Sequence, residues 1–175
     1  MQIITEGHAD TVLMEILRVP YRLINKSGGG KSQVAKAMET QSNKDFNKFL
    51  IGIIDADTEN TNKTRYFDDF TKIKSDTENR TTLYKKNNQY IIELCCPAIE
   101  RWLLDSADSL GLDLDTFGLS KDIKQFKKVT KSLGILKNND FKNFIRELNS
   151  RSAPAFVYLN ELLNELFEQA GVTRY

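Results

Sequence analysis

Cysteine and histidine are scarce in this chain of 175 residues, which holds two cysteines and one histidine. Cys95 and Cys96 are neighbours in the sequence. Neighbouring residues of a strand point to opposite faces, so we expect no disulfide between them. We expect both to be buried thiols in a reducing compartment. Three such side chains are too few for a standard zinc site, and a zinc-dependent function is therefore not predicted.

Long apolar runs and an excess of charge of one sign are absent as well. No apolar run reaches the length that spans a bilayer, and the first residues lead straight into a β-like segment rather than a signal peptide. We therefore expect a cytoplasmic protein without a membrane partner. The net charge, 25 basic minus 24 acidic residues, is +1, so composition alone does not indicate a nucleic-acid-binding protein.

The hydrophobic pattern alternates between short β-like runs and helical stretches. This order is typical of an α/β fold with a parallel sheet and right-handed crossovers. The continuous apolar run at 49–55 (FLIGIID) is typical of a strand that is covered on both faces. Residues 71–82 are polar and are expected to be irregular. Strands are predicted at 1–6, 21–25, 49–55 and 90–96, and helices at 9–18, 31–41 and 98–105.

The sequence becomes helical after residue 105. We therefore predict an α/β core at residues 1–105 and a helical C-terminal extension at residues 106–175 that packs on this core. An apolar stripe at 156–167 is expected to belong to the core, unless it is exposed to a partner. One side of an earlier predicted helix is formed by Ile123, Phe126, Thr130 and Leu133.

Acidic residues follow two of the predicted strands. Glu6 ends the first strand, and Asp55 and Asp57 end the buried one. The carboxyl ends of parallel strands meet at one edge of the sheet, where ligands bind, and residues two apart in a strand face the same way. Three carboxylates gathered there repel one another unless a cation neutralises them. Oxygen ligands of this kind suit Mg²⁺ or Mn²⁺.

Two further acids fit the same edge. Glu100 shares a helix face with Leu103 and Leu104, and a buried carboxylate needs a basic partner or a metal ion. Asp10 follows Glu6 by four residues, where it either caps the first helix or serves as an outer metal ligand. The alternative for all of these acids is structural, because acids that follow strands often form turns or helix caps.

Three segments resemble motifs of the Toprim family. Residues 4–10 (ITEGHAD) are similar to the family's (V/I)EGxxD opening, and residues 51–57 (IGIIDAD) to its hydrophobic strand that ends in DxD. The turn 30–32 (GKS) resembles the GGKS turn of Toprim domains of the OLD (overcoming lysogenization defect) type. The resemblance covers about the first 105 residues. Residues 106–175 carry no motif of this kind.

This resemblance implies a Toprim-like (Rossmann-like) fold, a mainly parallel sheet flanked by helices. It implies that Glu6 is a metal ligand or general base and that Asp55 and Asp57 bind Mg²⁺. Asp10 would be a further ligand, and Glu100 would belong to a second metal. The chain is too small for a topoisomerase or primase, so a nuclease is the expected member of the family. OLD-type nucleases carry an ATPase domain, which this chain lacks, so a separate ATPase subunit is an expected partner.

The glycine-rich turn before the second predicted helix has a competing interpretation. Residues 27–32 (SGGGKS) are similar to a P-loop, but the motif requires glycine where Asn25 stands, so a nucleotide-binding function needs a degenerate loop. Lys31 is a candidate catalytic residue if the turn lies at the edge of the sheet, within reach of a substrate phosphate. A phosphoacceptor role of Asp55 needs an acidic pair after the first strand, where only Glu6 stands.

Four lysines recur at helical spacing near the middle of the extension. On one interpretation they contact a nucleic-acid backbone, in a manner that depends on salt and not on base sequence. On the other they form an ordinary solvated helix face. These residues are Lys124, Lys127, Lys128 and Lys131.

The leading hypothesis is an Mg²⁺-dependent nuclease that cleaves phosphodiesters of DNA or RNA. It acts alone, as a homo-oligomer or as one subunit of an ATPase-coupled complex. Two alternatives stay open at this point. One is a Toprim-shaped module that binds a partner or nucleic acid without turnover, and the other is the degenerate P-loop nucleotide binder.

Overall fold

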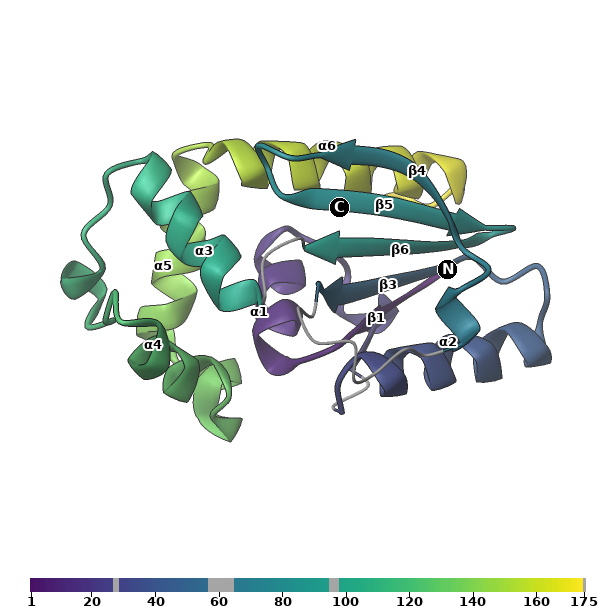
Figure 1. Cartoon of the computed structure of the whole chain (residues 1–175), viewed down its shortest axis with the longest axis horizontal. Coiled ribbons are helices and arrows are strands. Elements are labelled where there is room, and N and C mark those ends of the chain that lie inside the picture. The colour runs from purple at the N-terminus through teal and green to yellow at the C-terminus, as the bar shows by residue number, and fades with distance from the viewer. Residues whose placement is uncertain (27–28, 57–64, 95–97, 175) are drawn as a thin grey trace.

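The computed structural model of the chain describes residues 1–26, 29–56, 65–94 and 98–174 (Figure 1). Within these residues, six strands form one mixed sheet in the order β2-β1-β3-β6-β5-β4. Helices cover both faces of the sheet, so the predicted α/β class is confirmed. Asp57 and the two cysteines lie outside the described residues.

Four neighbouring strands are parallel to one another, as the alternation of strands and helices predicted. Ile3 pairs with Ile51, and Ile53 pairs with Ile92, so each central strand has apolar residues beside it. The second strand begins later than predicted, because the N–H of Leu23 bonds back to the Pro20 carbonyl at 2.8 Å in a short 3₁₀ helix. The parallel strands are β1 (Gln2–Thr5), β2 (Ile24–Lys26), β3 (Leu50–Asp55) and β6 (Gln89–Leu94).

An antiparallel hairpin extends the sheet, and the prediction that residues 71–82 are irregular is wrong. Strands β4 (Thr71–Asp76) and β5 (Thr81–Lys86) form this hairpin, and β5 pairs with β6. The carboxylate of Asp76 closes its turn by accepting the Asn79 N–H at 2.8 Å. Because β4 is an edge strand with exposed side chains, its sequence lacks the alternation that marks a half-buried strand.

Helix α2 (Lys31–Lys44) covers one face of the sheet, where its Val34 and Met38 pack with Ile4 of β1 and Ile91 of β6. A close approach to β3 depends on Gly52. A Cβ atom at this position would lie 2.8 Å from Met38 Sδ and 3.2 Å from Val34 Cγ1. The glycine therefore allows α2 to sit directly against the central strand.

The other face carries the main core, which is shared by α1 (His8–Ile16), the strands and the C-terminal helices. Trp102 lies in this core and stacks on Phe156 with ring centroids 5.0 Å apart. The apolar stripe of the last helix is buried, as predicted for a core element. The C-terminal helices are α3 (Ile99–Ser109), α4 (Ile123–Thr130), α5 (Asn139–Ser150) and α6 (Pro154–Gln169).

The extension differs from its prediction in one detail. Leu133 was expected on the buried side of a helix, but α4 ends at Thr130 and the Leu133 side chain is 85% exposed. The expected boundary after residue 105 falls inside α3. Figure 1 shows α3, α4 and α5 grouped beyond the carboxyl ends of β3 and β6. No helix among the described residues is both long and apolar enough to cross a membrane.

Candidate functional site

A cleft of about 570 Å³ opens at the carboxyl ends of β1 and β3. Its lining comes from six parts of the chain. They are the ends of the two strands, the first residues of α1 and α3, the turn before α2 and the last turn of α4. The carboxyl edge of a parallel sheet is where the sequence predicted a site. Four of the five predicted acids line this cleft, namely Glu6, Asp10, Asp55 and Glu100.

Glu6 and Asp55 lie close together because β1 and β3 are paired. The N–H of Glu6 bonds to the Ile53 carbonyl at 3.1 Å, which continues the pairing of β1 with β3. The Asp55 N–H then donates to Glu6 Oε2 at 3.0 Å. The carboxylate of Asp55 accepts the Ile99 N–H through Oδ1 at 2.9 Å, at the start of α3. Both side chains therefore have a defined direction at the edge of the sheet.

Asp10 sits in the first turn of α1 and is only 3% exposed. Its Oδ2 accepts the Gly7 N–H at 2.7 Å, so Asp10 helps to close the first turn of α1 as its third residue, while Gly7 rather than Asp10 is the N-cap. Its second oxygen, Oδ1, is buried and has no hydrogen-bond partner among the described residues. A cap needs only one oxygen, so the burial of the other one is not explained by capping.

Glu100 is equally buried, at 3% exposure, in the first turn of α3. Its Oε1 accepts the hydroxyl proton of Thr130 at 2.5 Å. Its Oε2 is buried without a hydrogen-bond partner in the described part of the chain. Sequence reasoning identified Glu100 as anomalous but missed Thr130. The available signal was a polar residue on the otherwise apolar side of α4.

Two of the four acids, Asp10 and Asp55, hold their protons more tightly than a free carboxylic acid does. Burial, followed by the negative charge of Glu6, raises the pKa of Asp10 from 3.8 to about 7. Burial and then the charges of Asp10, Glu6 and Glu100 raise the pKa of Asp55 from 3.8 to about 9. The N–H groups of Gly7 and Ile99 lower these two pKa values but do not offset the other effects. Full ionisation of the cluster is therefore unfavourable at neutral pH.

A divalent cation fits this donor set. All four groups supply hard oxygen donors, and Asp10 and Glu100, each with one buried oxygen that has no partner among the described residues, line the same cleft. In the described residues, no three acidic, histidine or cysteine side chains are grouped closely enough to hold an ion as they stand. These side chains would have to move closer together to hold an ion, and Asp57, the fifth predicted ligand, lies outside the described residues.

The predicted basic residues are divided between the cleft and the surface. Lys127 and Lys131 line the cleft, whereas Lys124 and Lys128 are exposed and lie outside its lining. Lys131 follows the last residue of α4 rather than belonging to it. Helical spacing thus grouped four lysines, of which two line the same cleft as the acids.

Lys31, which was predicted as a catalytic residue, also lies outside the cleft lining. Its Nζ lies 3.4 Å from Glu93 Oε1, and Glu93 Oε2 accepts the hydroxyl of Tyr84 at 2.9 Å. This ion pair holds Lys31 near β6, whereas the preceding Gly30 borders the cleft with a positive φ of 81°. His8 lines the cleft, and its Nδ1 is buried without a partner among the described residues.

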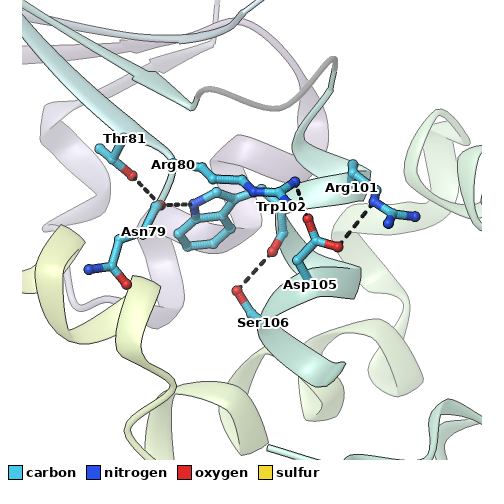
Figure 2. A network of polar contacts seen from close by, with 7 residues as sticks. All are labelled: Asn79, Arg80, Thr81, Arg101, Trp102, Asp105 and Ser106. Atoms are coloured by element: carbon cyan, nitrogen blue, oxygen red, sulfur yellow. Dashed lines mark hydrogen bonds and ion pairs between the residues drawn. The ribbon is translucent and has the colours of Figure 1, made fainter. Parts of the chain in front are cut away.

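A polar network anchors α3, which carries Glu100 (Figure 2). Asp105 forms ion pairs with Arg80, in the hairpin turn, and with Arg101 at 3.0 Å. The indole N–H of Trp102 donates to the Asn79 carbonyl at 3.1 Å, which also accepts the Thr81 hydroxyl. The unpredicted hairpin β4–β5 therefore fixes the helix that brings the fourth acid to the cleft.

Comparisons with protein-family models, with curated proteins and with solved structures found no match for this chain.

Proposed function

We propose that the chain is a metal-dependent nuclease with a Toprim-like fold and that the acidic cleft is its active site. The observation that carries this proposal is the way the four acids are held. Each has one oxygen anchored by a donor of the protein, and the second oxygens of Asp10 and Glu100 are buried without a partner in the described residues. Such groups are costly to bury unless they bind a cation.

Glu6, Asp10, Asp55 and Glu100 would hold Mg²⁺ or Mn²⁺, together with Asp57 as the resemblance implies. The ion would supply charge stabilisation to a phosphodiester and acidify a bound water. The anchored oxygens restrict the rotation of the four carboxylates before an ion binds, which lowers the entropic cost of assembling the site. In a one-metal arrangement, Glu6 is the candidate general base, because it stands at the junction of β1 and β3 beside Asp55.

A nucleic-acid phosphodiester is the substrate class that the surroundings of the cleft support best. Lys127 and Lys131 place positive charge in a cleft whose other charged groups are acidic, which suits a phosphate that is bound through a metal ion. Lys124 and Lys128 would extend this positive charge along the outer side of α4. DNA and RNA are both compatible with this arrangement, and a separate ATPase subunit remains the partner that the family resemblance suggests.

Nicking of supercoiled plasmid in Mg²⁺ and in Mn²⁺ tests the proposal. The wild type is expected to relax or linearise the plasmid, whereas Asp55→Ala is expected to show no cleavage above a metal-free blank. Asp108→Ala is the matched control, because Asp108 is an exposed acid on α3 outside the cleft lining, and it should cleave like the wild type. Cleavage by Asp55→Ala at the wild-type rate would contradict the proposal.

A separate result would favour the alternative of a binding module without turnover. Retained nucleic-acid binding in a gel-shift assay, without cleavage of plasmid or of single-stranded RNA in either metal, would point to that function. The nucleotide-binding alternative predicts instead that ATP binding is lost in Lys31→Ala and kept in Glu6→Ala.

A further inference from the structure

The fourth acid of the cleft differs from the other three in how it is anchored. Glu6, Asp10 and Asp55 each accept a backbone N–H, from Asp55, Gly7 and Ile99 respectively. Glu100 instead accepts a side-chain hydroxyl, that of Thr130, which lies thirty positions later in the sequence. The direction of its carboxylate therefore depends on a contact between α3 and α4, two helices that the sequence places in different parts of the chain.

We propose that Thr130 is a positioning residue that directs Glu100 toward the metal ion in the cleft. This inference rests on the proposed function, since it concerns the same metal site. It gives the C-terminal extension a direct part in the site, through a side chain that no motif identifies.

The geometry of the hydroxyl supports this role. A hydroxyl has one proton to donate, and Thr130 Oγ1 lies 2.5 Å from Glu100 Oε1 but 3.2 Å from the Lys127 carbonyl. The hydrogen bond to the carboxylate is the shorter and the stronger of the two, because its acceptor is charged. Both Thr130 and Glu100 are 3% exposed, so water does not compete freely for this bond. With Oε1 held in this way, the rotation of the carboxylate is restricted, and Oε2 has no hydrogen-bond partner in the described residues that would compete with an ion.

Burial gives a second reason. Thr130 occupies the buried side of α4 next to Phe126, a position where an apolar side chain would pack without a polar cost. The hydrogen bond to Glu100 replaces the bonds to water that the hydroxyl loses on burial. Partners that hold a metal ligand from behind commonly change metal affinity by about 10–100-fold when they are removed.

The test is Mn²⁺ affinity, measured by electron paramagnetic resonance of the free ion, for the wild type, Thr130→Val and Thr130→Ser. Valine keeps the shape of threonine without the hydroxyl, and serine keeps the hydroxyl without the methyl group. We expect the dissociation constant to rise about tenfold or more in Thr130→Val and to stay within about threefold of the wild type in Thr130→Ser. Thermal unfolding of the metal-free proteins is recorded alongside.

A matched control removes the same chemical group elsewhere. Thr82 is 4% exposed, its hydroxyl lies 3.1 Å from that of Ser75 in the hairpin, and it is outside the cleft lining. Thr82→Val is therefore expected to leave Mn²⁺ affinity unchanged, whatever it does to the melting temperature. Wild-type Mn²⁺ affinity in Thr130→Val would overturn the positioning role while leaving the metal site intact. Absence of Mn²⁺ binding by the wild type would overturn the proposed function itself.

Discussion

Replacement of Asp55 by asparagine is expected to stabilise the metal-free protein. Burial and the charges of three neighbouring acids raise the pKa of Asp55 to about 9, so the charged form is unfavourable in the folded state. Asparagine removes that charge and keeps an oxygen that can accept the Ile99 N–H. We expect a gain of about 2 kcal/mol or more in the free energy of unfolding at pH 8. Most substitutions of half-buried residues destabilise, so the sign is diagnostic of a functional site.

The pH dependence of this gain follows from the direction of the shift. The folded-state pKa of Asp55 lies above its unfolded value of 3.8, so the folded protein binds the proton more tightly. The contribution of Asp55 to stability is therefore fully present below about pH 4 and is lost as the pH rises toward about 9. The advantage of Asp55→Asn over the wild type should be small at pH 5 and larger at pH 8.

Urea unfolding at these two pH values, without and with Mg²⁺, measures the effect. Saturating Mg²⁺ should stabilise the wild type more than Asp55→Asn, because only the wild type keeps the full donor set. Asp105→Asn is the matched control on α3, where the loss of the ion pairs with Arg80 and Arg101 should lower stability slightly. A metal-free Asp55→Asn protein less stable than the wild type at pH 8 would contradict the electrostatic account of the cleft.

Replacement of Arg174 by methionine is expected to cost about 3 kcal/mol of stability. The guanidinium of Arg174 is buried at 5% exposure near the end of the chain. It donates to the Leu17 carbonyl from Nε at 2.9 Å and from a second nitrogen. It also donates to the backbone and side chain of Asn160 and to Asn164 Oδ1, the last at 2.7 Å. Arg174 thus ties α6 to the end of α1, the helix that carries Asp10.

Chemical denaturation followed by circular dichroism checks this expectation. Methionine keeps most of the aliphatic volume but leaves the Leu17 carbonyl and the Asn160 side chain without their charged donor. Arg146→Met is the matched control, since Arg146 is exposed and its bond to Asn143 lies at the surface. Its effect should stay within about 0.5 kcal/mol. Equal stability changes in the two variants would show that Arg174 does not hold the terminus.

The central part of the parallel half was predictable because β1, β3 and β6 are mostly buried and their sequences are rich in apolar residues. The run that forms β3 gives both a strand and the position of Asp55 at its end. The edge strand β4 was not predictable in this way, because its exposed side chains are free to be polar. The hairpin was consequently missed, together with the contacts of Arg80 and Asn79 that fix α3.

The candidate site was predictable to the extent that it depends on strand ends and helix faces. Glu100 could be identified from its own helix, because a carboxylate in an apolar stripe is anomalous wherever that stripe packs. Thr130 stood out only as a polar residue on an apolar helix face. Its bond to Glu100 could not be predicted, because the two residues are thirty positions apart and meet only through packing of α3 against α4. For Lys31 the motif was misleading. It suggested a contact with a substrate phosphate, whereas the side chain forms an ion pair with Glu93, a residue 62 positions later that only the tertiary structure brings near.

The central claim is that the acidic cleft binds a divalent cation, and a titration of Mn²⁺ into the wild type and Asp55→Asn tests it most directly. We predict saturable binding of one or two ions by the wild type. Loss of a residue that only supports a metal ligand typically weakens metal binding by about 10–100-fold, and the loss of a ligand itself should cost at least as much. We therefore expect Asp55→Asn to bind Mn²⁺ at least about 10-fold more weakly than the wild type. The absence of saturable binding by the wild type, or equal binding by both proteins, would contradict the account.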